Sequence, residues 1–162
     1  MNLPDNLPEK LDDTLALLAM LDRGDRIQML IDIADRFQEV PANIAIRPFD
    51  EAHKVPACES EAYAWAAPRP DDTLDFHFAV ENPQGISAKA MAVILRESLS
   101  GAPLDQVASL PGDVIYEIFG RELSMGKSMG LMGMVSMVAL SAKKAAAKNS
   151  GKKASTEGEV GG

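Results

Sequence analysis

The stretch EAYAWAAPRPDDTLDFHFAV, residues 61–80, decides the fold of this chain. In residues 61–67 a tyrosine and a tryptophan alternate with alanines, and in residues 73–80 leucine, two phenylalanines and valine alternate mostly with polar side chains. A period of two predicts β-strands. Residues 68–72 are a short connection between the two segments, so we expect an antiparallel hairpin.

Helical patterns precede this hairpin. In residues 8–21 leucines recur at every third or fourth position, and Gly24 follows as the stop signal. A second helix is expected after Asp25, whose side chain suits an N-cap, and Pro41 closes it. Residues 43–57 contain two prolines and no helical pattern, so we expect irregular chain or a short strand there.

Further helices follow the hairpin. Apolar periodicity and stop signals predict four of them, over residues 87–99, 103–110 and 113–119, and from near Lys127 to about Lys148. Helices, then a small antiparallel sheet, then helices again predict an α+β fold rather than a parallel α/β fold. We expect about three strands packed with the N-terminal and C-terminal helices, one domain over residues 1–148, and a disordered low-complexity tail over residues 149–162.

Charge is distributed unevenly along the 162 residues, which together carry −8. Residues 143–162 hold five lysines against two glutamates, so this tail carries +3 and residues 1–142 carry −11. The strong negative charge of residues 1–142 would repel the phosphates of a nucleic acid, so we expect no nucleic-acid partner. The basic tail is interpreted as frayed, solvated chain, with a grip on an acidic partner as the alternative. The sequence shows no run of eighteen apolar residues and no signal-peptide pattern, so we expect no membrane partner and a cytoplasmic location.

Cys58 is the only cysteine of the chain. Alone it forms neither an internal disulfide nor a metal site, so it is either buried as a small apolar residue or reactive. Glu59 and Glu61 indicate that the backbone here faces water, and their charges oppose formation of the thiolate. The side chains of His53 and Lys54 favour the thiolate.

Hydrolase and metal chemistry have little support in the sequence. His53 and His77 are the only histidines that could act as a base for Cys58. His77 falls on the polar face of its expected strand, where we expect a solvated surface histidine. No Cys/His pair has the spacing of zinc ligands, so we expect no metal and no bound cofactor.

Residues 124–140 are unusually rich in methionine and contain three glycines. The preferred interpretation is a core helix whose glycines permit a close approach to the sheet. A soft surface for a partner helix is one alternative. A membrane helix is another, but the segment is short for that role and is bounded by Lys127 and Lys143.

The order of these segments resembles the SufE family, the sulfur acceptors of SufS-type cysteine desulfurases in iron–sulfur cluster assembly. The resemblance spans about residues 8–144. Residues 57–63 correspond to the family's Gly-Cys-Gln-Ser segment and the Val-Trp pair after it. Residues 86–95 correspond to its apolar helix after the sheet, and residues 99–103 with Val107 correspond to the stop of that helix. Residues 123–124 and 127–131 correspond to its Leu-Ser/Thr and its Arg-Ser-x-Gly-Leu motifs. This chain is a divergent member of the pattern, with departures at Ala57, Glu59, Tyr63 and Lys127.

The resemblance implies a function. A desulfurase holding pyridoxal phosphate would pass sulfur to Cys58, and Cys58 would deliver it as a persulfide to a scaffold of the SufBCD kind. The chain would stimulate the desulfurase and act as a sulfur-transfer accessory protein without a cofactor rather than as a stand-alone enzyme. Lys127 would lie near the cysteine loop, where its charge favours the thiolate or contacts the partner; a solvated helix-terminal lysine is the alternative. Related proteins shelter this cysteine in an apolar pocket, and we expect the same here.

Two other functions stay open on the residues alone. One is a non-catalytic interaction module, with a structural cysteine and the methionine-rich helix as its binding surface. The other is a thiol redox sensor, in which Cys58 would oxidise to a sulfenic acid.

Overall fold

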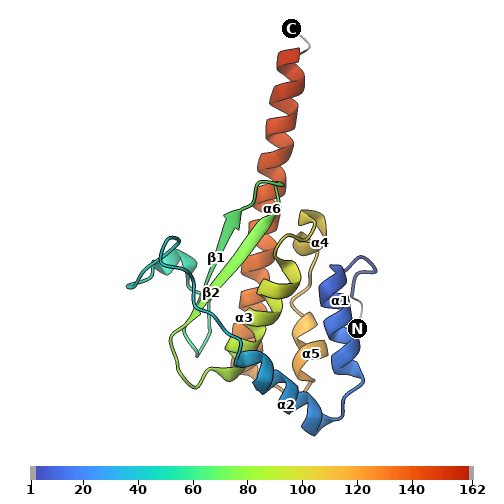
Figure 1. The fold of residues 1–162 in the computed structure, drawn as a ribbon, viewed down its shortest axis with the longest axis vertical. Helices are drawn as coiled ribbons and strands as arrows, with labels where there is room; N and C mark the ends of the chain where they lie inside the picture. Colours follow the sequence, from blue (N-terminus) through green and yellow to red (C-terminus); the bar gives the residue numbers. More distant parts are fainter. Residues whose placement is uncertain (1–2, 161–162) are drawn as a thin grey trace.

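The computed structural model describes residues 3–160, with side chains as far as Gly151. The fold is α+β, as expected, and the helices gather on one side of a two-stranded sheet (Figure 1). Its elements are α1 (Glu9–Ala19), α2 (Arg23–Ala34), the 3-10 turn η1 (Glu51–His53), β1 (Ala62–Pro68), β2 (Leu74–Val80), α3 (Ile86–Leu99), α4 (Leu104–Ala108), α5 (Val114–Phe119) and α6 (Met125–Val160).

The two strands form the expected antiparallel hairpin. Their register runs from the pair Ala62–Val80 to the pair Pro68–Leu74, and the connection is closed by a bond of 2.9 Å from the Arg69 amide to the Thr73 carbonyl. The apolar side chains of β2 are buried toward α3. Alternation along the sequence therefore predicted both the pairing and the buried face.

The expectation of about three strands was wrong, because residues 40–55 touch the sheet only at isolated points. The Val40 amide donates to the Phe78 carbonyl at 2.8 Å along one edge, and Lys54 forms a single bridge with Tyr63 along the other. Pro41 directly follows Val40, and Pro56 directly follows Val55. Proline has no amide hydrogen to offer a ladder, so pairing cannot extend into a third strand.

The helix α3 is the centre of the core. Nine of its 14 residues are buried, because α1, α2, α6 and β2 all pack around it. Helix α6 contributes one continuous stripe, formed by Leu131, Met134, Val135, Val138 and Ala142. The spacing of this stripe is that of one face of a helix.

Two helix starts differ from the expected positions by two residues or more. Helix α2 begins at Arg23, because the carboxylate of Asp22 accepts a bond of 2.8 Å from the Asp25 amide and so forms the N-cap. The prediction of Asp25 as the cap was wrong, and Gly24 lies in the first turn of α2 rather than ending α1. Helix α6 begins at Met125, before the expected residue, with its first turn capped by the preceding serine.

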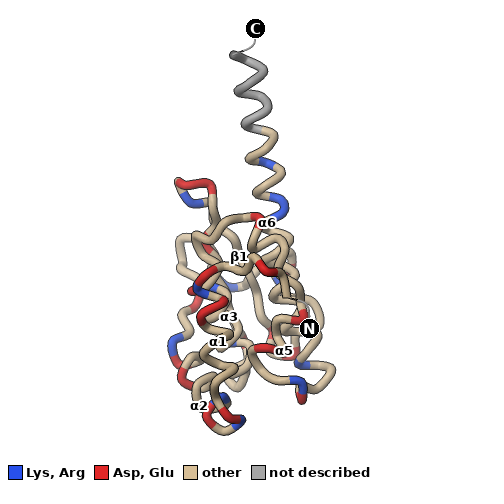
Figure 2. The backbone as a smooth tube through the Cα atoms, turned by 90° about the vertical axis from the view of Figure 1, so that its right-hand side faces the viewer, with Lys and Arg blue, Asp and Glu red and all other residues tan. Residues whose placement is uncertain are grey.

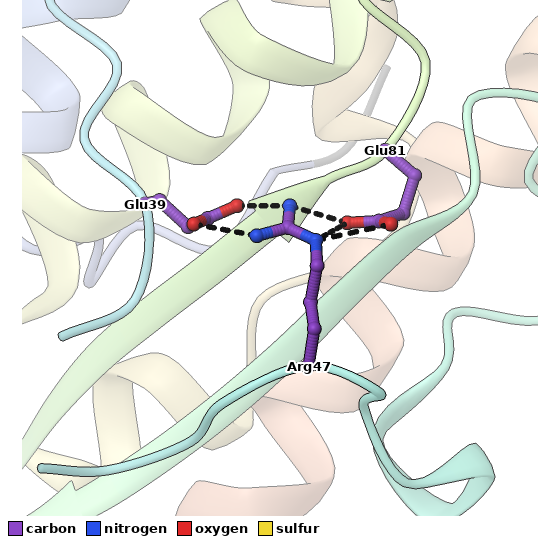
Figure 3. Close-up of polar contacts among 3 residues, drawn as sticks. All are labelled: Glu39, Arg47 and Glu81. Atoms are coloured by element: carbon purple, nitrogen blue, oxygen red, sulfur yellow. Dashed lines mark hydrogen bonds and ion pairs between the residues drawn. The ribbon is translucent and has the colours of Figure 1, made fainter. Parts of the chain in front are cut away.

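Residues 40–54 cover the face of the sheet that the helices leave open (Figure 1). Phe49 packs edge-on against the buried Trp65, with ring centroids 5.0 Å apart. The guanidinium of Arg47 lies 4.9 Å from the centre of the Phe49 ring and reaches two carboxylates. It bonds Glu39 at 2.8 Å and Glu81 at 3.0 Å (Figure 3). The segment that leads to Cys58 is therefore fixed to the sheet by both charge and aromatic packing.

Helix α6 continues well beyond the body of the protein (Figures 1 and 2). Basic residues lie where it emerges, and the Asn149 side chain still donates to the Asp72 carbonyl at 3.2 Å. The helix extends to Val160, and side chains beyond Gly151 lie outside the described ones. The division of the chain at residue 148 stays a prediction.

One part of α6 has the length and composition of a membrane-spanning helix. This part is Met125–Gly151. Its most apolar window of 18 residues has a mean hydropathy of 1.2, and 44% of that window is buried inside the protein. Core helices commonly meet the same criterion, and the buried stripe of α6 accounts for the apolar composition.

Candidate functional site around Cys58

Cys58 lies near the middle of a short loop, residues 56–61, that we call the cysteine loop. Its base is closed by a bond of 2.8 Å from the Val55 amide to the Ala62 carbonyl. Within it, the Glu61 amide donates to the Cys58 carbonyl at 3.0 Å. The cysteine side chain is half-buried. Secondary structure therefore anchors the base of the loop while Cys58 stands at its tip.

Three glycines of α6 lie directly against the loop and the residue before it. A Cβ on Gly130 would lie 3.0 Å from the Cα and 3.2 Å from the Sγ of Cys58. A Cβ on Gly133 would lie 2.9 Å from a methyl group of Val55, and one on Gly126 would overlap the carboxylate of Glu59. The glycines were expected to bring α6 close to the sheet, but they bring it close to the cysteine loop.

Cys58 opens into a pocket of about 320 Å³. The residues around it come from the loop, from the turn before α3, from the first turn of α3 and from the first two turns of α6. They are Cys58, Glu59, Ser60, Asn82, Gln84, Gly85, Ile86, Ser87, Ala88, Gly126, Lys127, Gly130 and Leu131. The lining contains amide, hydroxyl and charged groups, so the shelter of the cysteine is more polar than the expected apolar pocket.

The pocket around Cys58 contains groups of both signs of charge. Amides in the first turn of a helix lack partners within the helix and carry partial positive charge. The first turns of both α3 and α6 line the pocket, and the ammonium of Lys127 lies in the second of them. Glu59 opposes this field from the loop. The structure thus brings together Cys58 and Lys127, the two predicted site residues, whose roles stay predictions.

Neither histidine lies among the residues around the pocket. The Nδ1 atom of His53 lies 3.0 Å from the Ala64 carbonyl, and its ring stacks on Trp65 with centroids 5.3 Å apart. His77 is half-buried on β2 rather than solvated, and its Nδ1 is buried without a hydrogen bond. Burial lowers the pKa of His77, and the positive charge of Arg96 acts in the same direction. The geometry offers no histidine as a base for Cys58.

The described side chains contain no group of three or more His, Cys, Asp or Glu residues able to hold a metal ion. The pocket itself offers the thiol of Cys58, amide and hydroxyl groups, the carboxylate of Glu59 and the ammonium of Lys127.

Sequence reasoning missed two parts of the site. Asn82 and Gln84 reach the pocket from the turn before α3, and only the Asn-Pro-Gln-Gly composition hinted at a turn there. A second hollow of about 340 Å³ adjoins the first and shares Ile86, Ser87 and Lys127 with it. Its wall on α2 includes Ile27, which is 49% exposed. We call this second hollow the α2 groove.

Comparison with known proteins agrees with this arrangement. A family model described as the SufE Fe-S metabolism associated domain matches residues 12–142. A hypothetical protein from Thermus thermophilus, known from its solution structure, is 23% identical to the chain with a TM-score of 0.67. That match covers 88% of this chain and 99% of the other protein, and at this identity it shows a shared fold. No curated protein matched the chain.

The matched residues include the hairpin, the cysteine loop and the start of α6, so they contain both walls of the Cys58 pocket. The order of motifs described above falls within the same boundaries. With the family model covering well over half of its length, this chain belongs to the SufE family, whose domain is associated with iron–sulfur metabolism.

Proposed function

We propose that the chain accepts sulfur on Cys58 from a cysteine desulfurase and delivers it to a scaffold that assembles iron–sulfur clusters in the cytoplasm. The observation that carries the proposal is the position of Cys58. It is a half-buried thiol at the tip of an anchored loop, facing a pocket formed by two helix N-termini and Lys127. Membership of the SufE family supports iron–sulfur metabolism as the setting.

The chemical step is an exchange at sulfur. The Cys58 thiolate attacks the outer, sulfane sulfur of a persulfide on the donor's cysteine. The bond between the donor's two sulfur atoms breaks, and the donor leaves as a thiolate. Cys58 then carries the persulfide, and no external oxidant or reductant is consumed. A second exchange of the same kind passes the sulfur to the scaffold.

The pocket suits both forms of the carrier. A thiolate and a persulfide anion each place negative charge on sulfur at the point where the first turns of α3 and α6 converge. The amide side chains of Asn82 and Gln84 add neutral hydrogen-bond donors on the same wall. Half-burial also limits the access of oxidants to the sulfur between its two transfers.

The α2 groove gives the donor a surface on which to dock. A protein that reaches Cys58 from the side of the pocket also meets the groove, because the two hollows share Ile86, Ser87 and Lys127. The exposed side chains of Ile27 and Ile86, which are 49% and 48% accessible, offer apolar surface to cover. We assign the desulfurase as the occupant of this groove.

The intact mass of the protein tests the proposal. Incubation with a SufS-type desulfurase, its pyridoxal phosphate and free cysteine is expected to add about 32 Da, one sulfur atom, which a reductant removes. The Cys58→Ser variant should gain no sulfur yet still bind the desulfurase. If several desulfurases leave the mass unchanged, the proposal fails, and a non-catalytic interaction module becomes the better-supported function. A gain of oxygen under peroxide without any gain of sulfur would instead indicate a redox sensor.

A further inference from the structure

The cysteine loop contains unusual backbone conformations on both sides of Cys58. Ala57 has a φ of 55° and Glu61 a φ of 52°. In this left-handed region the Cβ of an ordinary residue crowds the following carbonyl oxygen, so glycine is the residue that usually occupies it. Among the described residues only one other non-glycine position, Asp72 in the β1–β2 turn, has a positive φ. The strain is thus concentrated around the reactive residue.

Strained conformations persist only where the surroundings hold them in place. Here α6 supplies the hold, through a surface made of Gly126, Gly130 and Gly133 that we call the glycine seat. These positions lie on one face of the helix, because Gly130 is four positions after Gly126 and Gly133 is three positions after Gly130. With no side chains in the way, the helix backbone approaches Val55 and the tip of the loop closely.

Backbone hydrogen bonds hold the base of the loop in a different way. The Val55 amide bonds the Ala62 carbonyl at 2.8 Å, and the Asn82 amide bonds the Ser60 carbonyl at 3.1 Å. The base is therefore fixed to β1 and to the turn before α3, whereas the tip at Cys58 packs on α6. Ala57 lies between the anchored base and the tip, where a hinge would be expected. Glu61 belongs to the base, because its carbonyl accepts a bond of 3.2 Å from the Glu81 amide.

We propose that the glycine seat holds the cysteine loop in a strained, sheltered conformation, and that Gly130 and Ala57 are positioning residues that set how readily Cys58 leaves its pocket. Contact with the seat favours the sheltered state. Relief of the left-handed backbone at Ala57 favours release, so a partner can draw out Cys58 while β1 and α6 stay in place. The proposal deepens the proposed function and rests on it in treating Cys58 as the reacting group.

The test measures the alkylation of Cys58 by iodoacetamide, followed by intact mass, in native buffer and in urea. In the Gly130→Ala variant the new methyl group would lie 3.0 Å from the Cys58 backbone, so the loop must shift. We expect native alkylation to accelerate about fivefold or more, with no change in urea. Gly151→Ala is the matched control, because it adds the same methyl group to the same helix with no atom within 4 Å.

Two further variants refine the result. Gly126→Ala meets mainly the flexible end of Glu59, which can move aside, so its effect should be smaller than that of Gly130→Ala. Ala57→Gly relieves the strain of the sheltered state and should slow alkylation about fivefold. Thermal unfolding of each variant, followed in parallel, separates release of the loop from loss of the fold.

The proposal is overturned if Gly130→Ala reacts at the rate of Gly151→Ala, or if Ala57→Gly reacts as fast as the natural chain or faster. These outcomes are independent of sulfur transfer, because alkylation reports the position of the thiol without any desulfurase. If no persulfide forms on Cys58 but the variants react as expected, the proposed function fails and the loop mechanism stands.

Discussion

Cys58 and Lys127 line one pocket, although the first precedes β1 and the second belongs to the opening turn of α6. The close packing of the glycine seat against the cysteine loop brings these distant segments together. Packing of the α6 backbone on the cysteine loop therefore places Lys127 and Cys58 in the same pocket, without a direct bond between the two side chains.

Replacing Lys127 with glutamine should slow the acceptance of sulfur by Cys58 about two- to fivefold. The change removes one positive charge from a partly exposed pocket that, in the proposed function, would hold an anion during transfer, and the charge of a helix terminus remains. The rate of persulfide formation at a fixed desulfurase concentration, followed by intact mass, gives the measurement. Lys144→Gln, an exposed lysine of α6 away from the pocket, is the control. Equal rates for the two variants would assign Lys127 to the solvated surface.

Replacing Ile27 with aspartate should weaken docking of the desulfurase. The change places a charge in the α2 groove, where binding would otherwise cover an apolar side chain that is 49% exposed. We expect the desulfurase concentration at half-maximal transfer to rise about tenfold, with little change in the rate at saturation. Leu140→Asp is a suitable comparison, because Leu140 is 50% exposed and lies outside the groove. A similar loss in both variants would show that the groove is not the docking surface.

The bridge formed by Arg47 should make stability depend on pH in the acid range. Hydrogen bonds from Arg47 hold the pKa of Glu39 below its ordinary value. A carboxylate with a lowered pKa in the folded state stabilises the fold above its ordinary pKa, and this stabilisation disappears as the pH falls through the lowered value. The Arg47→Gln variant should lose less stability between pH 5 and pH 3 than the natural chain does. Urea unfolding at each pH measures this, and a parallel fall in both proteins would contradict it.

His77 should contribute a second pH dependence, at higher pH. Its pKa is lowered first by burial and then by the charge of Arg96, while Asp75 opposes the shift. The unfolded chain therefore binds a proton more readily than the folded one, so stability falls as the pH drops below the ordinary range of histidine. We expect His77→Gln to flatten the stability curve between pH 7 and pH 5. Urea unfolding at each pH measures this slope, and an unchanged slope in His77→Gln would contradict the expectation.

Local patterns predicted the elements of this fold, and non-local contacts decided the rest. Alternation in residues 61–80 predicted the hairpin and its buried face, because strand periodicity is written in consecutive residues. The prediction of a third strand was wrong, since Pro41 and Pro56 directly follow the only residues of segment 40–55 whose backbone amides bond the sheet edges. The start of α2 was misplaced because either of two nearby aspartates could have been its N-cap. Only the hydrogen bond that the Asp22 side chain accepts identifies Asp22 as the cap.

The site could be predicted in part. The resemblance placed Lys127 near the cysteine loop, and the pocket contains both. Asn82 lies opposite Ser60 in the continued register of the hairpin, and its amide bonds the Ser60 carbonyl at 3.1 Å, so the predicted hairpin could have placed it beside the cysteine loop. The position of Gln84 could not be predicted in this way, because it depends on the turn that leads into α3. The close approach of Gly130 to the loop was likewise out of reach, since nothing local distinguishes its contact with a loop from contact with a sheet.

The projecting end of α6 has a practical consequence for studying transfer. Gly130 lies against Cys58, and the exposed Ser150 lies farther along the same helix, about 30 Å away at 1.5 Å per residue. A fluorophore or an immobilisation handle joined near Ser150 would thus stand clear of both the pocket and the α2 groove. Tethered at that point to a sensor surface, the protein would present its thiol outward, and successive arrivals of donor and scaffold could be followed on a single layer of molecules.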